Sequence, residues 1–237
     1  MRLKFASYNI HKGVGLDRKR NPARILSVLR ELDADVIALQ EADRRLGSRA
    51  SVLSRAALDD TPWRAADVAR RPQSMGWHGN VLLVRRDIAI LDAEALDLPT
   101  LEPRGAACVK LEYRGVRFRV IGTHLDLSGF RRRDQIKAII ERVANAREDL
   151  PTVLLGDFNQ WRGKAGAMEE FEPYSPDGWQ PLDPGRSFPS RQPIASLDRI
   201  VASEEWSNAR CGVHHSHLSA MASDHLPVWC DMELTRT

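Results

Sequence analysis

The chain has few of the features that mark several classes of protein. Only three of its 237 residues are cysteines, and none stands in a Cys-x-x-Cys pair, which argues against a disulfide framework or a zinc knuckle. We expect Cys108, Cys211 and Cys230 to be small core residues in a reducing compartment. No stretch approaches the roughly 18 uninterrupted apolar residues of a membrane span, and the first residues lack the apolar segment of a signal peptide. The sequence therefore predicts a soluble, cytoplasmic protein without a transmembrane segment.

A strong charge of one sign is also missing. The chain has 35 Lys and Arg against 32 Asp and Glu, a net charge of +3, which permits a polyanionic partner without requiring one. We find no low-complexity linker and no repeat with a period of about 20–50 residues. With 43% hydrophobic residues the chain can bury a sizeable core, and its length alone allows one large domain or two small ones.

The opening of the chain predicts a β-α-β unit. Residues 3–10 alternate like a strand, and residues 21–32 predict a helix with Asn21 as N-cap and Pro22 at the first helical position. Residues 35–41 return to a short buried strand. The simplest arrangement is a parallel pair of strands with the helix packed against them.

The rest of the chain predicts further strands and one long helix. Four strand-like segments with short connections indicate hairpins, a helix follows with apolar residues at helical spacing, and three strand-like segments come after it. We therefore expect a mixed sheet system with helices outside. The segments are 79–86, 88–96, 105–113 and 116–126, then the helix around 136–143, then 152–159, 196–203 and 226–234.

Polar residues occupy the ends of the apolar strands. In "TVLLGDFNQW" the buried strand runs directly into Asp157 and Asn159. Taken alone, Gly-Asp-x-Asn is good turn chemistry, but strand ends in layered α/β folds also hold ligands over a crevice. The same placement recurs along the chain, which favours a site over a set of turns. It is found at Asn9, Glu41, His124, Asp198, Asp224 and His225.

The chemistry of these residues is coherent. Their carboxylate and amide oxygens are hard donors that suit Mg²⁺ or Mn²⁺. His124 and His225 can hand over or stabilise a proton near neutral pH. Asp198 would accept the second ring N–H of His225 and fix its tautomer. Such groups around a hard cation are typical of enzymes that attack a phosphate ester.

Eight short motifs occur in this order along the chain: SYNIHKG, ALQE, GNVLLVRR, EPRGA, IGTHLD, LLGDFN, LDRI and SDHLPV. This series resembles that of the endonuclease/exonuclease/phosphatase superfamily, the deoxyribonuclease-like group of metal-dependent phosphohydrolases. The resemblance covers nearly the whole chain and implies a single domain over residues 1–237. The implied fold is α/β: a four-layer α/β/β/α sandwich, with two mixed sheets packed face to face and helices outside, whose strand ends meet at one cleft.

The resemblance also implies a role for each candidate residue. Glu41 corresponds to the principal ligand of Mg²⁺ or Mn²⁺, with Asn9 and Asp224 completing the metal site. Asp157 is expected to align and deprotonate the attacking water, and Asn159 to bond a phosphoryl oxygen.

The histidines and the remaining polar residues complete the expected site. His225 with Asp198 would stabilise the transition state or position the nucleophile, and His124 would act as acid to the leaving oxygen or as a phosphate donor. Arg104 could grip phosphate with its planar fork, and His78 and Asn80 are candidates to line the same cleft.

Two other patterns have plainer explanations. The histidines of His214–His217 suggest zinc, but no Cys or carboxylate stands at ligand spacing, so we expect no zinc there. Arg131–Arg133 stand near a predicted helix N-terminus, where positive charge opposes the helix dipole. A solvated face is favoured for them over contact with an anionic substrate.

The sequence thus predicts a divalent-metal-dependent phosphodiesterase or phosphatase that uses in-line attack of water on phosphate. Its partner is the phosphoester substrate, whether a small molecule, lipid-linked or nucleic acid, and no stable protein partner is implied. One alternative is a DNA endonuclease or exonuclease of the same superfamily, although "SYNIHKG" and "LQEAD" depart from the motifs of AP endonucleases. The other alternative is a non-catalytic binding module that keeps the fold.

Overall fold

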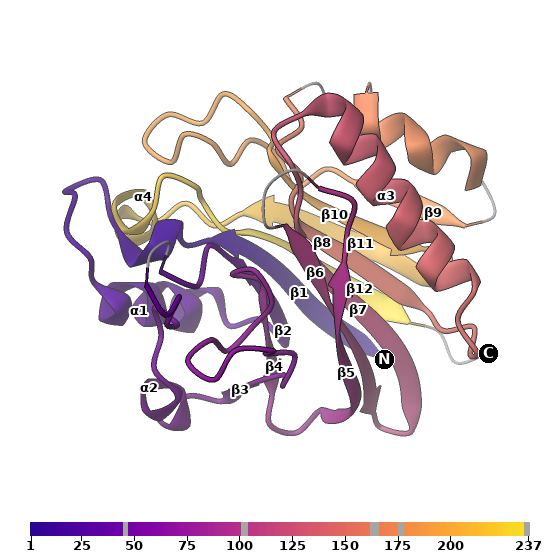
Figure 1. Cartoon of the computed structure of the whole chain (residues 1–237), viewed down its shortest axis with the longest axis horizontal. Coiled ribbons are helices and arrows are strands. Elements are labelled where there is room, and N and C mark those ends of the chain that lie inside the picture. Colours follow the sequence, from indigo (N-terminus) through magenta and orange to yellow (C-terminus); the bar gives the residue numbers. More distant parts are fainter. Residues whose placement is uncertain (45–46, 101–103, 162–165, 175–177, 235–237) are drawn as a thin grey trace.

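The computed structural model describes residues 1–44, 47–100, 104–161, 166–174 and 178–234. Two six-stranded sheets dominate it (Figure 1). The first sheet has the strand order β11 (Trp206–Val213), β12 (Val228–Leu234), β1 (Arg2–Asn9), β2 (Val36–Gln40), β4 (Val81–Arg85) and β3 (Trp63–Ala65). The second has the order β5 (Ala89–Asp97), β6 (Gly105–Tyr113), β7 (Val116–His124), β8 (Thr152–Asp157), β10 (Asp198–Ser203) and β9 (Trp179–Leu182).

Helices cover the outer face of each sheet. The first sheet carries α1 (Pro22–Leu32), α2 (Arg55–Asp59) and α4 (His217–Ala222), and the second carries α3 (Gly129–Ala144) and the 3-10 helix η2 (Gly166–Tyr174) (Figure 1). A short 3-10 helix, η1 (His11–Gly13), follows β1.

Three apolar clusters separate these layers. The central cluster joins the inner faces of the two sheets and includes Phe5, Phe118 and Trp206, whose rings meet edge to face. A second cluster lies between the first sheet and α1, and a third between the second sheet and α3. Because apolar faces must be buried on both sides of each sheet, the layers follow as α/β/β/α. The predicted four-layer sandwich of two mixed sheets is confirmed.

Each sheet contains one parallel strand pair joined by a helix. β1 pairs with β2 and β7 pairs with β8, while the other pairings are antiparallel. The predicted β-α-β unit at the start of the chain is confirmed, and so is its helix N-cap. The side chain of Asn21 accepts a hydrogen bond from the N–H of Arg24, which satisfies one of the free N–H groups at the start of α1. The apolar face of α3 is buried at Ile136, Ile139 and Ile140.

The prediction of successive hairpins is wrong at one connection. β5, β6 and β7 form two hairpins as expected, but β4 pairs with β2 and β3 in the first sheet, whereas β5 pairs with β6 in the second. The short turn after β4 therefore carries the chain from one sheet to the other. A short connection restricts how far two strands lie apart but not whether they share a sheet, so loop length alone did not reveal this crossing.

The cysteines differ from the expectation of three free thiols. Cys108 is free and buried, as predicted, but Cys211 and Cys230 form a disulfide. They face each other across the β11–β12 pair, a register that depends on a strand not predicted from the sequence. Disulfides persist mainly in oxidising compartments, so this bond counts against the cytoplasmic location, which stays a prediction. Among the helices that the structure describes, none has the length and apolar content needed to cross a membrane.

Candidate active site

Strand register brings the candidate residues to one edge of the sandwich. In the first sheet Asn9 lies opposite Gln40, so that Glu41 follows directly beside it. In the second sheet Asp157 lies between His124 and Asp198, its register partners on the two neighbouring strands. The carboxyl ends of parallel strands meet at one edge of a sheet, which is where ligands bind in open α/β folds.

The parallel pair β7–β8 tolerates no side chain at one point. Gly156 lies opposite Thr123, and a Cβ built on Gly156 would stand 1.9 Å from the carbonyl oxygen of Thr123. Any other residue would push the two strands apart just before His124 and Asp157. This glycine therefore sets the spacing of the two functional side chains.

Asp157 is the centre of the arrangement. One carboxylate oxygen, Oδ2, accepts a hydrogen bond from Nδ2 of Asn9 at 3.0 Å and lies 3.4 Å from Nε2 of His124 and 3.8 Å from Nε2 of His225. The other, Oδ1, accepts the backbone N–H of Asn159 at 2.9 Å. Only 1% of Asp157 is exposed, so its orientation is fixed by these contacts.

His225 and Asp198 form a buried pair behind Asp157. Nδ1 of His225 lies 2.8 Å from Oδ2 of Asp198, which also accepts a hydrogen bond from the hydroxyl of Ser187 at 2.5 Å. Burial alone would lower the pKa of His225, but the charge and hydrogen bond of Asp198 outweigh it and raise the pKa to about 10. The ring is therefore protonated at neutral pH, with Nε2 turned toward Asp157.

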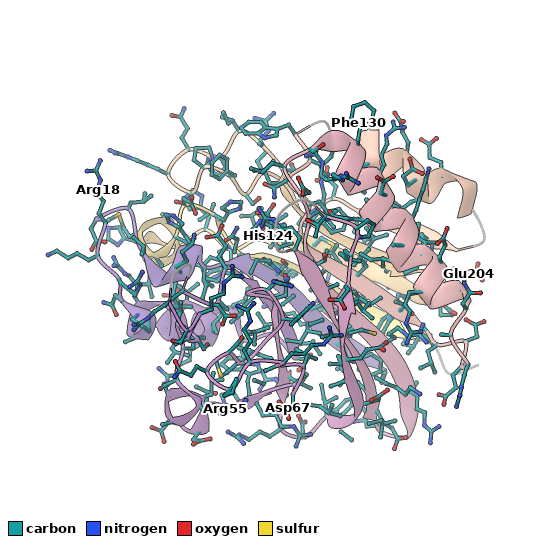
Figure 2. The ribbon with its side chains drawn as sticks, in the orientation of Figure 1. Arg18, Arg55, Asp67, His124, Phe130 and Glu204 are labelled. Atoms are coloured by element: carbon teal, nitrogen blue, oxygen red, sulfur yellow. A yellow bond between two sulfur atoms is a disulfide. The ribbon has the colours of Figure 1, made fainter. Side chains whose placement is uncertain are left out.

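His124 is in the opposite protonation state. Burial, together with the charge of Arg104, lowers its pKa to about 4, although the Asp157 carboxylate opposes that shift. His124 is thus a neutral imidazole at pH 7. Figure 2 shows it in the interior of the view, where the strands of the two sheets converge.

Glu41 is paired with a lysine that the sequence analysis did not single out. The ammonium group of Lys12 donates a hydrogen bond to Oε2 of Glu41, and the backbone N–H of Lys12 donates to the carbonyl of Glu41 at 3.1 Å. Burial alone would raise the pKa of Glu41, but the hydrogen bond and charge of Lys12 hold it below its usual value. Both residues have positive φ, 57° and 53°, a backbone conformation that is uncommon outside functional sites and turns.

Asp224 completes this side of the site. Its Oδ1 lies 3.3 Å from the hydroxyl oxygen of Ser223 and 3.7 Å from Nδ1 of His11. The hydroxyl of Ser223 donates to the carbonyl oxygen of Asn9 at 2.7 Å. The segment before β12 is therefore tied to the end of β1.

A cleft of about 680 Å³ opens over these side chains. All the predicted site residues line it except Asp198, which lies behind His225, and Asn80. The Asn80 amide is buried and donates to the carbonyls of Trp77 and Gly105 at 3.1 and 3.0 Å, so it joins the chain before β4 to the start of β6. Other lining residues were not predicted: Lys12, Asp43, Arg44, Arg49, Arg71, Ser74, Gly76, Trp77, Gly79 and Leu127.

Some of the cleft residues that were not predicted have a recognisable signal in the sequence, and others have none. Lys12 stands inside the "SYNIHKG" motif, and Arg44 is the third residue after "ALQE", so both could have been included by considering the motifs and their neighbours. Arg49 and Arg71 stand in segments without regular apolar periodicity. Only their position in the fold reveals that they face the same cleft.

The donor chemistry of the cleft fits a hard divalent cation. Glu41, Asn9 and Asp224 offer carboxylate and amide oxygens on its first-sheet side, which suits Mg²⁺ or Mn²⁺. A second donor group combines Asp157, Asp198 and His225, whose ligand atoms all lie within 4.8 Å of one another. In that group Nδ1 of His225 is already bound to Asp198, so the oxygen-rich set is the better match.

The histidines of His214–His217 and the arginines of Arg131–Arg133 include residues that contact other side chains of the protein. Nε2 of His214 lies 2.9 Å from Glu31, and no metal-ligand group found among the described residues includes the His214–His217 segment. Arg133 pairs with Glu169, and Nε of Arg132 donates to the side chain of Gln160 at 3.2 Å. These arginines are held by the protein itself.

Comparison with known proteins identifies the class to which this fold and site belong. Residues 6–225 match the sequence profile of the Endonuclease/Exonuclease/phosphatase family, so the chain belongs to that family, whose name denotes enzymes that act on phosphoester bonds.

Individual relatives span most of the chain. The protein YbhP of Escherichia coli (strain K12) is 26% identical over 98% of this chain and 96% of its own length. A mannosyl-6-phosphatase of Bacteroides thetaiotaomicron is similar in structure, with a TM-score of 0.75 and 18% identity over 98% of this chain and all of the other. TDP2 of D. rerio, solved with a single-strand DNA product, has a TM-score of 0.70 and 18% identity over 98% of this chain and 99% of its own. At these identities the two structures show the fold alone.

Proposed function

We propose that this protein is a Mg²⁺- or Mn²⁺-dependent phosphoester hydrolase that acts on a small or lipid-linked phosphodiester or phosphomonoester. The observation that carries the proposal is the convergence of Asn9, His124 and His225 on the buried carboxylate of Asp157. A buried acid surrounded by three polar side chains at the floor of a cleft is costly for a merely structural role. It is suited to hold and deprotonate a water molecule.

Each of the candidate site residues has a specific task in the proposed reaction. Asp157 accepts the proton of the attacking water, and Asn9 fixes the orientation of that carboxylate. The imidazolium of His225, held by Asp198, stabilises the negative charge that develops on the phosphoryl oxygens. His124 and Asn159 donate hydrogen bonds to the phosphate.

A metal ion held by Glu41, Asn9 and Asp224 would supply Lewis acidity toward a phosphate oxygen. Lys12 contacts Glu41 in this structure, so the ammonium would have to move when the ion binds. The Lys12 side chain is long and half-buried, which makes such a movement feasible.

The fold does not identify the substrate. The similar structures include a sugar phosphatase and a protein solved with a DNA product, as expected where one catalytic core serves several substrates. The cleft volume lies in the range of about 300–1,000 Å³ that is typical of small-molecule sites. A DNA nuclease remains the second candidate because cationic side chains line the same cleft.

The first test is hydrolysis of bis-p-nitrophenyl phosphate and of p-nitrophenyl phosphate with Mg²⁺, with Mn²⁺ and with EDTA, beside a plasmid-nicking assay. We expect metal-dependent product from at least one of the two esters and none with EDTA. Nicking without ester hydrolysis would favour the nuclease. No metal-dependent product in any of the three assays would favour the non-catalytic binding module.

A further inference from the structure

One wall of the cleft is built from two segments that lie far apart in the sequence. The segment after β2 and the segment before β4 are joined where the backbone N–H of Ser51 donates to the carbonyl of Gln73 at 2.8 Å. The hydroxyl of Ser74 donates to the carboxylate of Asp43 at 2.6 Å and fixes the same two segments side by side. This wall is therefore a defined surface held by hydrogen bonds.

Three arginines on these segments, Arg44, Arg49 and Arg71, line the cleft; we call them the arginine wall. Within the described parts of the chain, none of their guanidinium groups forms an ion pair or hydrogen bond with a carboxylate. Their neighbour Arg70 is different, since it pairs with Asp97 at 2.8 Å and stacks on Trp77. The arginine wall thus presents three guanidinium groups that no carboxylate binds directly, although the Asp43 carboxylate lies on the same wall.

The arginine wall and the catalytic residues act on different neighbours. The charges of Arg71 and Arg49 add to burial in lowering the pKa of His78. At the catalytic end the arginine whose charge acts on His124 is Arg104. The arginines whose charges act on His78 thus differ from the arginine whose charge acts on His124.

A concave surface lined by charge of one sign concentrates oppositely charged ligands. Arginine is also well suited to phosphate and carboxylate, because its planar group offers paired donors. Arg44 and Arg71 are exposed to solvent, so the repulsion among the three charges is screened, and an anion bound between them would relieve what remains.

We propose that the arginine wall is a second anion site, and that the substrate is a small phosphoester carrying a second phosphate or carboxylate group away from the bond that is cleaved. This inference rests on the proposed function for the placement of the reacting phosphate. The anion site itself is defined by the arginines and can be tested without turnover.

The probes are butane-1,4-bisphosphonate and butylphosphonate, which differ in one anionic group and resist hydrolysis. Isothermal titration in low salt, with Mn²⁺ and separately with EDTA, measures their affinities for the wild type and for the variant Arg44→Gln/Arg49→Gln/Arg71→Gln. The matched control, Arg18→Gln/Arg30→Gln/Arg55→Gln, removes the same charge from exposed positions that do not line the cleft; Arg18 and Arg55 lie at the periphery of the view in Figure 2.

We expect the wild type and the control to bind the bisphosphonate about tenfold more tightly than the monophosphonate, a preference that several partly exposed charges in one cleft can supply. The arginine-wall variant should lose this preference and keep its affinity for the monophosphonate. The preference should also shrink at about 0.5 M salt, because added ions screen exposed charges. Circular dichroism checks that each variant is folded.

Equal affinity of the wild type for the two probes would overturn the second anion site. So would an equal loss of preference in the control variant, which would assign the effect to net charge. A single-stranded DNA octamer that binds more tightly than the bisphosphonate, and that loses binding in the arginine-wall variant, would replace the small substrate by a nucleic acid. Failure of the proposed hydrolysis would appear separately, as absence of product from the nitrophenyl esters.

Discussion

The two strand–helix–strand units of this protein have the same architecture and carry different chemistry. β1-α1-β2 in the first sheet and β7-α3-β8 in the second each place a parallel strand pair under one helix. The first unit ends in Asn9 and Glu41, which are oxygen donors. The second ends in His124 and Asp157, which can take part in proton transfer and hydrogen bonding.

Under the proposed function, two similar scaffolds supply different parts of the site. The oxygen donors of the first unit suit a cation, and the histidine and buried acid of the second suit activation of water. His225 joins the two, because it precedes β12 in the first sheet while its ring binds Asp198 in the second. The following predictions compare the two units, first in turnover, then in stability, and then in metal binding.

The largest effect is expected at the residue that links the sheets. His225→Ala should lower turnover of a nitrophenyl ester by about 10³-fold, because a preorganised positive charge beside the phosphate is lost. Its affinity for Mn²⁺, measured by calorimetry, should stay within about twofold of the wild type. The exposed His215→Ala serves as control, and retention of more than a third of wild-type turnover by His225→Ala would contradict the assignment.

Removing a buried side chain from the helix should lower the stability equally in the two units. Leu29 of α1 and Ile139 of α3 are both fully buried against their sheets, so each change to Ala should lower the free energy of unfolding by about 2–5 kcal/mol. Urea unfolding followed by circular dichroism measures both. The exposed controls Arg30→Ala and Glu141→Ala should shift it by less than about 0.5 kcal/mol. A large loss in one unit alone would show that the two helices do not contribute alike.

Metal affinity should respond mainly in the first unit. Glu41→Ala should weaken Mn²⁺ binding at least about tenfold, because a hard cation loses a carboxylate ligand. Calorimetric titration gives the dissociation constant, with the exposed Glu31→Ala as control. Equal affinities for Glu41→Ala and the wild type would remove Glu41 from the coordination of the ion.

The smallest effect is expected at Lys12, which the proposed metal ion would displace from Glu41. Lys12→Gln should strengthen Mn²⁺ binding by about threefold, since the ion no longer displaces an ammonium group from Glu41, and partly exposed ion pairs are weak. The same titration measures this change, with Lys19→Gln as control. Weaker binding in Lys12→Gln would mean that Lys12 supports the metal site instead of competing for it.

Most of the fold could be predicted because its central strands are continuous apolar runs. β2 and β8 are buried along their entire length, and such strands have a strong sequence signal. The edge strands β3, β9 and β11 were missed because they are short or largely exposed, and β11 also shifts register at Ser207 and Arg210. The chain crossing after β4 depends on packing between sheets, which no local pattern encodes.

The candidate site was predictable where it coincides with strand ends. Asn9, His124 and Asp157 each end a strand. Parallel pairing of β7 and β8 places His124 beside Asp157, whereas the approach of Asn9 depends on how the two sheets pack. The roles assigned to the site residues stay predictions. Asn80 shows the limit of motif reasoning, because its buried amide binds two backbone carbonyls beside the cleft. The arginine wall could not be predicted from the sequence, because Arg49 and Arg71 line the same cleft only after two irregular segments have folded.

The pairing of Lys12 with Glu41 has a consequence for the protein when divalent ions are scarce. An isolated carboxylate in a largely buried position would be electrostatically costly and would loosen its surroundings. Here the neighbouring ammonium group of Lys12 neutralises it, so Glu41 has a counter-charge whether or not an ion is bound. For the proposed metal-dependent hydrolase, we therefore expect chelation to stop turnover reversibly while the melting temperature barely changes.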